Sequence, residues 1–271
     1  MESFNSPIHI TALDLLFSTG LVLIAGIVSI ALQLKLERKL FLAALRTAIQ
    51  LFLVGYVLKY IFAFQNATFM VLVIGTMIGF ASLAAVKRAD RQLKDAAGMA
   101  FITLTLSSLI TTFLVTRVII GVKPWYEARY LIPLLGMILG NALNGLSLCL
   151  NKLLDSFADK KAEVELHLSL GGNRWEAARD TIRAGVRTGM IPIINTMMVV
   201  GVVSLPGMMT GQIIAGASPV EAVKYQIVVM FMVAAGTSLG CILMALLVYR
   251  RLFNSQHQLQ AELILPDANP R

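Results

Sequence analysis

Long apolar runs alternate with short polar loops along this sequence. A helix needs roughly 20 apolar residues to cross the hydrocarbon core of a bilayer. Inside lipid every backbone N–H and C=O group must find a partner within the protein, so such runs fold as helices. Only 14% of the residues are charged, against about 25% in soluble globular domains. We therefore expect an all-α, polytopic membrane protein embedded in a lipid bilayer.

The apolar runs predict one transmembrane domain over residues 1–253 with about seven spans. The expected spans are 12–33, 40–62, 68–86, 97–121, 130–150, 188–205 and 223–248. Residues 151–187 form a long loop. Residues 254–271 are polar and aperiodic, and we expect them to be a flexible tail.

Positive charge alternates along the loops. Lys and Arg concentrate in the first, third and fifth loops and after the last span, whereas residues 62–67 and 205–222 contain neither. Cytoplasmic loops carry the excess of Lys and Arg in membrane proteins. We therefore expect the inner (plasma) membrane of the cell, with the N-terminus outside and the C-terminus in the cytoplasm. The net charge of +8 belongs to these loops, and we expect no nucleic-acid partner.

The long cytoplasmic loop is predicted to form a helix, a tight turn and a second helix. Residues 162–170 alternate apolar and polar types as a strand does. A lone strand beside a helical bundle would leave its edges unpaired, so we interpret them as a helix. Glycine tolerates the positive φ of a turn, which Gly171-Gly172 would supply. Asn173 followed by Glu176 matches a capping box at the start of the second helix.

The second helix presents two features that suit an interface. Arg179, Arg183 and Arg187 form a cationic stripe at four-residue spacing, with Glu176 and Asp180 as expected partners. Trp175 is an aromatic anchor of the kind found at the centre of protein interfaces. An amphipathic helix lying on anionic lipid explains the same pattern, and the residues alone favour neither explanation.

The string from Glu165 to Arg179 resembles the EAA coupling loop of ABC transporter permeases, although Leu166 and His167 replace the alanines usual after the glutamate. In those permeases the loop sits in a cleft of the ATPase subunit. The resemblance assigns this coupling role to Glu165, Gly171, Gly172, Arg174, Trp175, Glu176 and Arg179.

Three further strings extend the resemblance over roughly residues 10–253. Pro133–Gly145, Arg187–Asn195 and Ser204–Gln212 resemble the FetB family of iron-export permeases, whose plant relatives are linked to aluminium tolerance. The resemblance implies a homodimeric permease driven by a separate cytoplasmic ABC ATPase. It also implies export of iron, with a role in metal homeostasis and in resistance to oxidative stress.

No sign of catalysis or of a resident cofactor accompanies these features. The phosphate-binding string G-x-x-x-x-G-K-[ST] does not occur, and without it the chain lacks the cradle for ATP. We therefore expect ATP and Mg²⁺ to bind to the partner ATPase, and this chain to be a transport subunit rather than an enzyme. No motif identifies a metal site.

Polar side chains inside spans are costly and default to functional roles. Arg46 and Gln50 lie one turn apart in the second span, and either snorkelling or a transport role explains them. Asn141 and Asn144 follow Gly136-x-x-x-Gly140, a spacing typical of closely packed helices. The two asparagines are candidates for interhelical hydrogen bonds or for lining a pathway.

The sixth span and the loop after it add further pathway candidates, Asn195, Met197, Met198, Met208 and Met209. Methionines usually serve as soft packing. As metal ligands their thioethers prefer Cu(I) to Fe(II), which disagrees with iron as the cargo. Residues 205–222 are uncharged over most of their length and Gly-rich, and they suit a re-entrant element.

An ATP-independent secondary transporter of a metal or a small solute is the alternative function. Such a transporter needs an ionisable group for coupling within the membrane. No carboxylate is evident in the middle of an expected span, which favours the ATP-driven permease.

Overall fold

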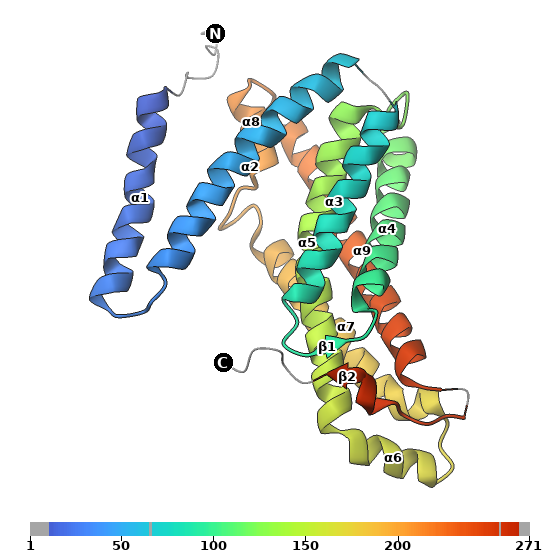
Figure 1. Cartoon of the computed structure of the whole chain (residues 1–271). Coiled ribbons are helices and arrows are strands. Elements are labelled where there is room, and N and C mark those ends of the chain that lie inside the picture. The colour runs from blue at the N-terminus through green and yellow to red at the C-terminus, as the bar shows by residue number, and fades with distance from the viewer. Residues whose placement is uncertain (1–10, 65–66, 255, 266–271) are drawn as a thin grey trace.

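The computed structural model describes residues 11–64, 67–254 and 256–265, and nearly all of its secondary structure is helical (Figure 1). In chain order the elements are α1 (Ala12–Ala31), α2 (Glu37–Phe64), α3 (Ala67–Lys87), β1 (Gln92–Leu93), α4 (Ala96–Phe113), the π-helix η1 (Leu114–Ile119), α5 (Ala128–Asp159), α6 (Lys161–Ser169), α7 (Arg174–Val199), α8 (Gly207–Ile214), α9 (Pro219–Leu252), the 3-10 helix η2 (Ala261–Leu263) and β2 (Ile264–Leu265). The expected all-α, polytopic membrane protein is confirmed.

Six of these helices are long and apolar enough to cross a membrane. They are Leu13–Ala31, Glu37–Ala63, Ala67–Lys87, Ala96–Ile119, Ala128–Asp159 and Pro219–Leu252. They correspond to six of the expected spans.

The remaining expected span, 188–205, is not one continuous helix. α7 ends at Val199, and Gly201 with φ 85° begins a tight turn in which its N–H donates to the Ser204 carbonyl at 2.9 Å. Residues 188–199 rise only about 18 Å as a helix, so the segment is long enough to cross only together with α8. We call this segment, residues 188–214, the broken span. A count of seven spans stays a prediction.

The core forms around α5, which packs against α3, α4, α7 and α9. Its face toward these helices buries large side chains completely, among them Leu135, Ile138 and Leu146. The tightest approach is at two glycines. A Cβ added to Gly189 of α7 would lie 2.6 Å from the Gly145 carbonyl oxygen of α5 and 2.7 Å from Cys241 Sγ of α9. Only glycine permits backbones to meet this closely.

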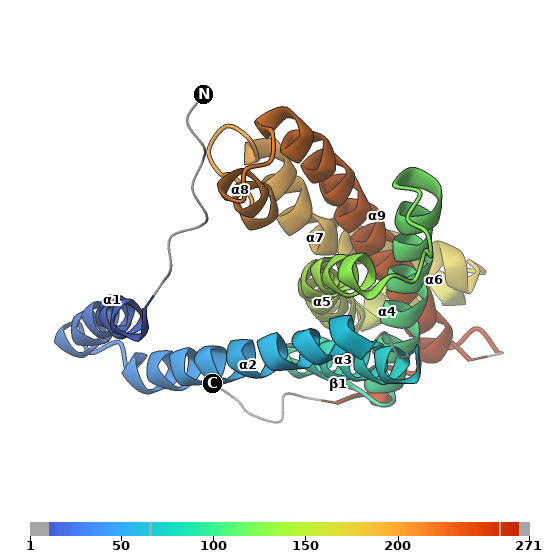
Figure 2. The same cartoon turned by 90° about the horizontal axis from the view of Figure 1, so that it is seen from above.

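The hairpin of α1 and α2 stands apart from this core (Figures 1 and 2). Thr11 caps α1, because its hydroxyl accepts the Asp14 N–H at 3.3 Å and its own N–H donates to the Asp14 carboxylate at 2.8 Å. α2 meets the bundle near its carboxyl end, where Ile61 packs with Met70 and Ile132. The apolar faces of this hairpin are otherwise exposed, as suits contact with lipid.

The flexible tail expected over residues 254–271 is wrong for residues 256–265. β2 pairs antiparallel with β1, with Leu93 opposite Ile264, and these two side chains are only 5% and 8% exposed. The Gln260 N–H also donates to the Leu252 carbonyl at 2.7 Å. Apolar burial and backbone pairing thus fix this segment against the bundle, although its polar composition predicts no ordered structure. Residues 266–271 lie outside the described residues.

Candidate functional site

The loop expected to couple to a partner is a compact projection at the end of α5, which we call the knob (residues 160–187). α6 ends at Ser169. Gly171, in the turn that follows, has a φ of 91°, and a Cβ on Gly172 would lie 2.8 Å from the His167 carbonyl oxygen. Asn173 Oδ1 accepts the N–H groups of Trp175 and Glu176 at 3.0 and 2.9 Å, and the Glu176 carboxylate accepts the Asn173 N–H at 2.8 Å. The predicted helix, glycine turn and capping box are confirmed.

A cleft of about 570 Å³ lies between α6 and the start of α7. Its charged and ionisable lining residues are Lys152, Lys160, Glu163, His167, Glu176, Arg179 and Asp180. The lining therefore mixes both signs of charge.

The arginine stripe is partly paired within its own helix. Asp180 Oδ1 lies 3.3 Å from an Arg183 guanidinium nitrogen and 3.9 Å from Arg179 Nε. Glu176 is engaged in the capping box instead. On α6, Glu165 pairs with Lys161 at 3.6 Å. All these pairs are exposed, so each contributes little to stability.

Trp175 is 46% exposed, but it also makes a contact that the sequence does not reveal. Its ring meets Tyr249 of α9 edge-on at 5.7 Å, and the Arg174 guanidinium lies over the same Tyr249 ring at 5.9 Å. Tyr249 contacts Phe253 at 5.4 Å, and Phe253 contacts Phe157 of α5 at 5.9 Å. This chain of rings joins the knob to α9 and α5, two helices of the core.

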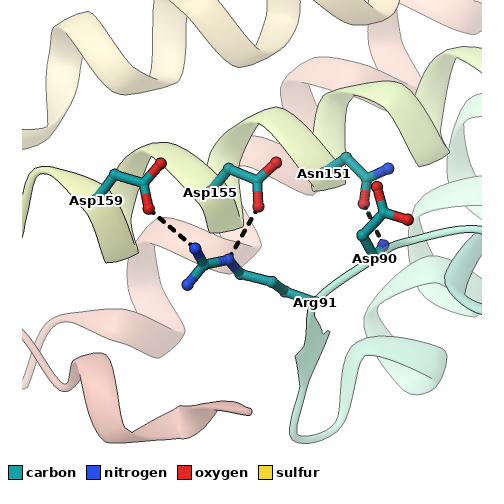
Figure 3. Close-up of polar contacts among 5 residues, drawn as sticks. All are labelled: Asp90, Arg91, Asn151, Asp155 and Asp159. Carbon is teal, nitrogen blue, oxygen red and sulfur yellow. Dashed lines mark hydrogen bonds and ion pairs between the residues drawn. The ribbon is translucent and has the colours of Figure 1, made fainter. Parts of the chain in front are cut away.

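A second linkage, absent from the sequence prediction, joins the loop between α3 and α4 to the end of α5 (Figure 3). Arg91 reaches Asp155 through Nε at 3.0 Å and Asp159 through a terminal nitrogen at 2.9 Å. The Asp90 N–H donates to Asn151 Oδ1 at 2.7 Å. The three α5 residues are spaced four apart and so share one helix face. That spacing is the only signal the sequence offers, and it names no partner.

The pathway candidates on α2 and α5 do not come together. Arg46 and Gln50 are exposed on α2, and Arg46 is 15 residues, or about 22 Å of helix rise, before the contact at Ile61. Asn141 donates to the carbonyl of its own helix neighbour Met137 at 2.9 Å. Asn144 accepts a hydrogen bond from Arg88 of the loop between α3 and α4.

The close helix packing expected at Gly136-x-x-x-Gly140 is absent at Gly140. A Cβ added to Gly140 would meet nothing within 4 Å, and one on Gly136 would make an ordinary contact with Met77 at 3.4 Å. The close approach of helices lies instead at Gly145 and Gly189.

The candidates of the broken span separate into two cavities and an exposed face. Met197 and Met209 line one cavity, whereas Met208 lines another with Gln212. Asn195 and Met198 are exposed, Met198 to 76%. The structure thus brings Met197 and Met209 together and leaves the other three apart from them.

Within the described residues, no three His, Cys, Asp or Glu side chains gather as metal ligands. The string Gly236-Thr-Ser-Leu-Gly240 matches the hydrolase pattern G-x-S-x-G, but it lies inside α9. The nucleophile of that pattern needs a sharp turn between a strand and a helix, so these residues serve helix packing.

Comparison with known proteins places the chain among membrane proteins. The model of an uncharacterised protein family, UPF0014, matches residues 12–253. A UPF0014 membrane protein of Synechocystis is 39% identical over 83% of this chain and 87% of its own. The probable iron export permease protein FetB of Escherichia coli is 37% identical over 93% and 95%. Protein ALUMINUM SENSITIVE 3 of Arabidopsis thaliana is 32% identical over 91% and 89%. No solved structure matches the chain.

Proposed function

Because the chain belongs to the UPF0014 family of membrane proteins, we propose that it is the membrane-spanning permease subunit of an ATP-driven metal exporter. Its relative in Escherichia coli is named a probable iron export permease, so iron is the first cargo to test. The proposed complex contains two copies of this chain and a separate cytoplasmic ABC ATPase. In it the knob and the C-terminus face the cytoplasm and the N-terminus lies outside the inner membrane.

The observation that carries this proposal is the knob and its connection to the core. The chain has no phosphate-binding string of its own, so the energy of ATP must enter through a contact with another protein. The knob offers an exposed cleft whose rigid turn is fixed by Gly172 and the capping box. Trp175 and Tyr249 then join it to α9. A movement of the docked ATPase would pass through these contacts to the core helices.

The cleft favours a protein partner over a lipid surface. Anionic headgroups attract Lys and Arg and repel carboxylates. The cleft lining includes Glu163, Glu176 and Asp180 among its basic residues. A surface of mixed charge suits a protein interface with complementary charges.

Copurification with the cognate ATPase tests the proposal. We expect the double variant Trp175→Ala/Glu176→Ala to lose both assembly and permease-stimulated ATP hydrolysis. Lys224→Ala is the matched control, because Lys224 forms an exposed ion pair with Glu221 at the far end of α9. If the double variant assembles and stimulates hydrolysis as the control does, docking through the knob is wrong.

Transport into vesicles separates this function from the secondary transporter. An ATP-driven exporter requires ATP and is inhibited by vanadate, whereas a secondary transporter requires neither the ATPase nor ATP. Deletion of the gene tests whether iron is the cargo. If the intracellular iron content is unchanged, iron is not the cargo, but the proposed permease function is unaffected.

A further inference from the structure

A cavity of about 470 Å³ lies where α7 ends, between the broken span and α9. Three methionines line it, Met197 from α7, Met209 from α8 and Met230 from α9. Gln226, one turn before Met230 on α9, lines it as well. The donors therefore come from three different helices and meet at one place.

Gln226 carries an unsatisfied polar atom at this cavity. The residue is only 7% exposed, and within the described residues its Oε1 has no hydrogen-bond partner. A buried carbonyl oxygen without a partner costs free energy. A ligand bound in the cavity would supply the missing interaction.

The end of α7 adds a favourable field for a cation. The carboxyl end of a helix carries partial negative charge on its unpaired carbonyl groups. In the described part of the chain, the Met197 and Met198 carbonyls accept no backbone N–H, since Gly201 donates to Ser204 and Val202 donates to Val199. Discontinuous membrane helices place such ends at cation sites in transporters.

The lining residues also select the kind of cation. They include neither a carboxylate nor a Lys or Arg side chain, so neither a hard, highly charged metal nor an anion finds its usual partners. Thioethers bind soft cations, and Cu(I) is the typical case.

We propose that the cavity is a binding site for a soft, singly charged metal cation of the Cu(I) class. The thioethers of Met197, Met209 and Met230 are its ligands, and the Gln226 amide oxygen completes the set. The inference rests on the proposed function, because it places the site on the route of an exported metal. It adds a cargo class that differs from the iron named for the Escherichia coli relative.

Competition with a chromophoric Cu(I) chelator, using the purified full-length protein in detergent, tests the site. The measurement uses a Cys149→Ala/Cys241→Ala background, so that the two buried thiols do not bind the probe. We expect saturable binding of Cu(I). Met197→Leu, Met209→Leu and Gln226→Leu should each weaken it by at least about tenfold, the scale on which even outer-shell changes act.

Met232→Leu is the matched control, because Met232 lies on α9, is 2% exposed and packs in the core. Size-exclusion profiles show which variants remain folded. Binding that is equal in the background and in the Met197→Leu/Met209→Leu/Met230→Leu variant overturns the inference, as does equal weakening by Met232→Leu. Equal binding of Fe(II) overturns the soft-cation class.

The two proposals fail separately. Loss of ATPase docking would leave Cu(I) binding by the isolated chain intact. If the methionine variants export iron normally and the protein does not bind Cu(I), the proposed Cu(I) site is wrong but the proposed permease function is unaffected.

Discussion

Replacement of Gly189 by alanine tests how tightly the three central helices are packed. The added Cβ would lie 2.6 Å from the Gly145 carbonyl oxygen, 2.7 Å from Cys241 Sγ and 2.9 Å from Cys149 Cβ. Ordinary van der Waals contact begins at about 3.4 Å, so α7 must move by up to ~0.8 Å from α5 and α9. The nearest wall is backbone, which has no alternative rotamer to adopt.

Overpacking of a core costs about 1–3 kcal/mol, and we expect a value near the upper end because the obstacles lie on two helices. One kcal/mol shifts the melting temperature by roughly 2–4 °C in a domain of this size. Gly189→Ala should therefore melt about 6–12 °C below the wild type. Thermal unfolding of the purified protein in detergent, followed by circular dichroism, measures the shift.

Gly140→Ala makes the same change in α5 where the added Cβ meets nothing within 4 Å. Alanine is the better helix former by up to about 1 kcal/mol, so this control should match or exceed the wild type. Gly145→Ala should resemble Gly189→Ala, and the double variant should cost less than the sum, because the first substitution already separates α5 from α7. A Gly189→Ala protein that melts with the wild type would refute the close approach.

Three other features are testable in the same preparation. Gly171→Ala forces a non-glycine residue to φ 91°, which costs roughly 1–2 kcal/mol. The variant should stimulate ATP hydrolysis by the partner less than the wild type does, and full stimulation would show that the glycine turn is not required. Ile264→Ala removes a buried side chain from the segment that pairs with the loop between α3 and α4, and it should destabilise the protein by about 2 kcal/mol. The control Glu262→Ala changes an exposed side chain and should melt as the wild type does. Arg91→Ala should lower stability by only about 1 kcal/mol, because its ion pairs are still partly open to solvent. It should nevertheless speed amide exchange in residues 88–95, and unchanged exchange would mean that the Asp155 pair does not hold this loop.

Features that depend only on residues close together in the sequence could be predicted correctly. The capping box of Asn173 and Glu176 depends on two residues three apart, and both form the expected bonds. The turn at Gly171 is similarly local. Apolar length predicts six of the helices for the same reason, since the cost of exposed backbone in lipid acts on each segment separately.

Features that depend on how helices face one another could not be predicted. Gly136-x-x-x-Gly140 has the spacing of a close-packing motif, but α5 turns Gly140 away from its neighbours and brings Gly145 to Gly189 instead. Arg91 pairs with carboxylates 64 and 68 residues further along the chain, and no local pattern indicates this pairing. The return of Ile264 to Leu93 is of the same kind.

The chain of rings at Trp175 has a spectroscopic consequence. The protein contains two tryptophans. Trp125 contacts Phe113 and Tyr126 next to the start of α5, and Trp175 lies beyond the other end of that helix, which is about 48 Å long. Trp125→Phe would leave one indole, half exposed and beside Tyr249. Its emission would then report burial of the knob by a partner, and its anisotropy would follow the loosening of the Tyr249 contact, without any attached dye.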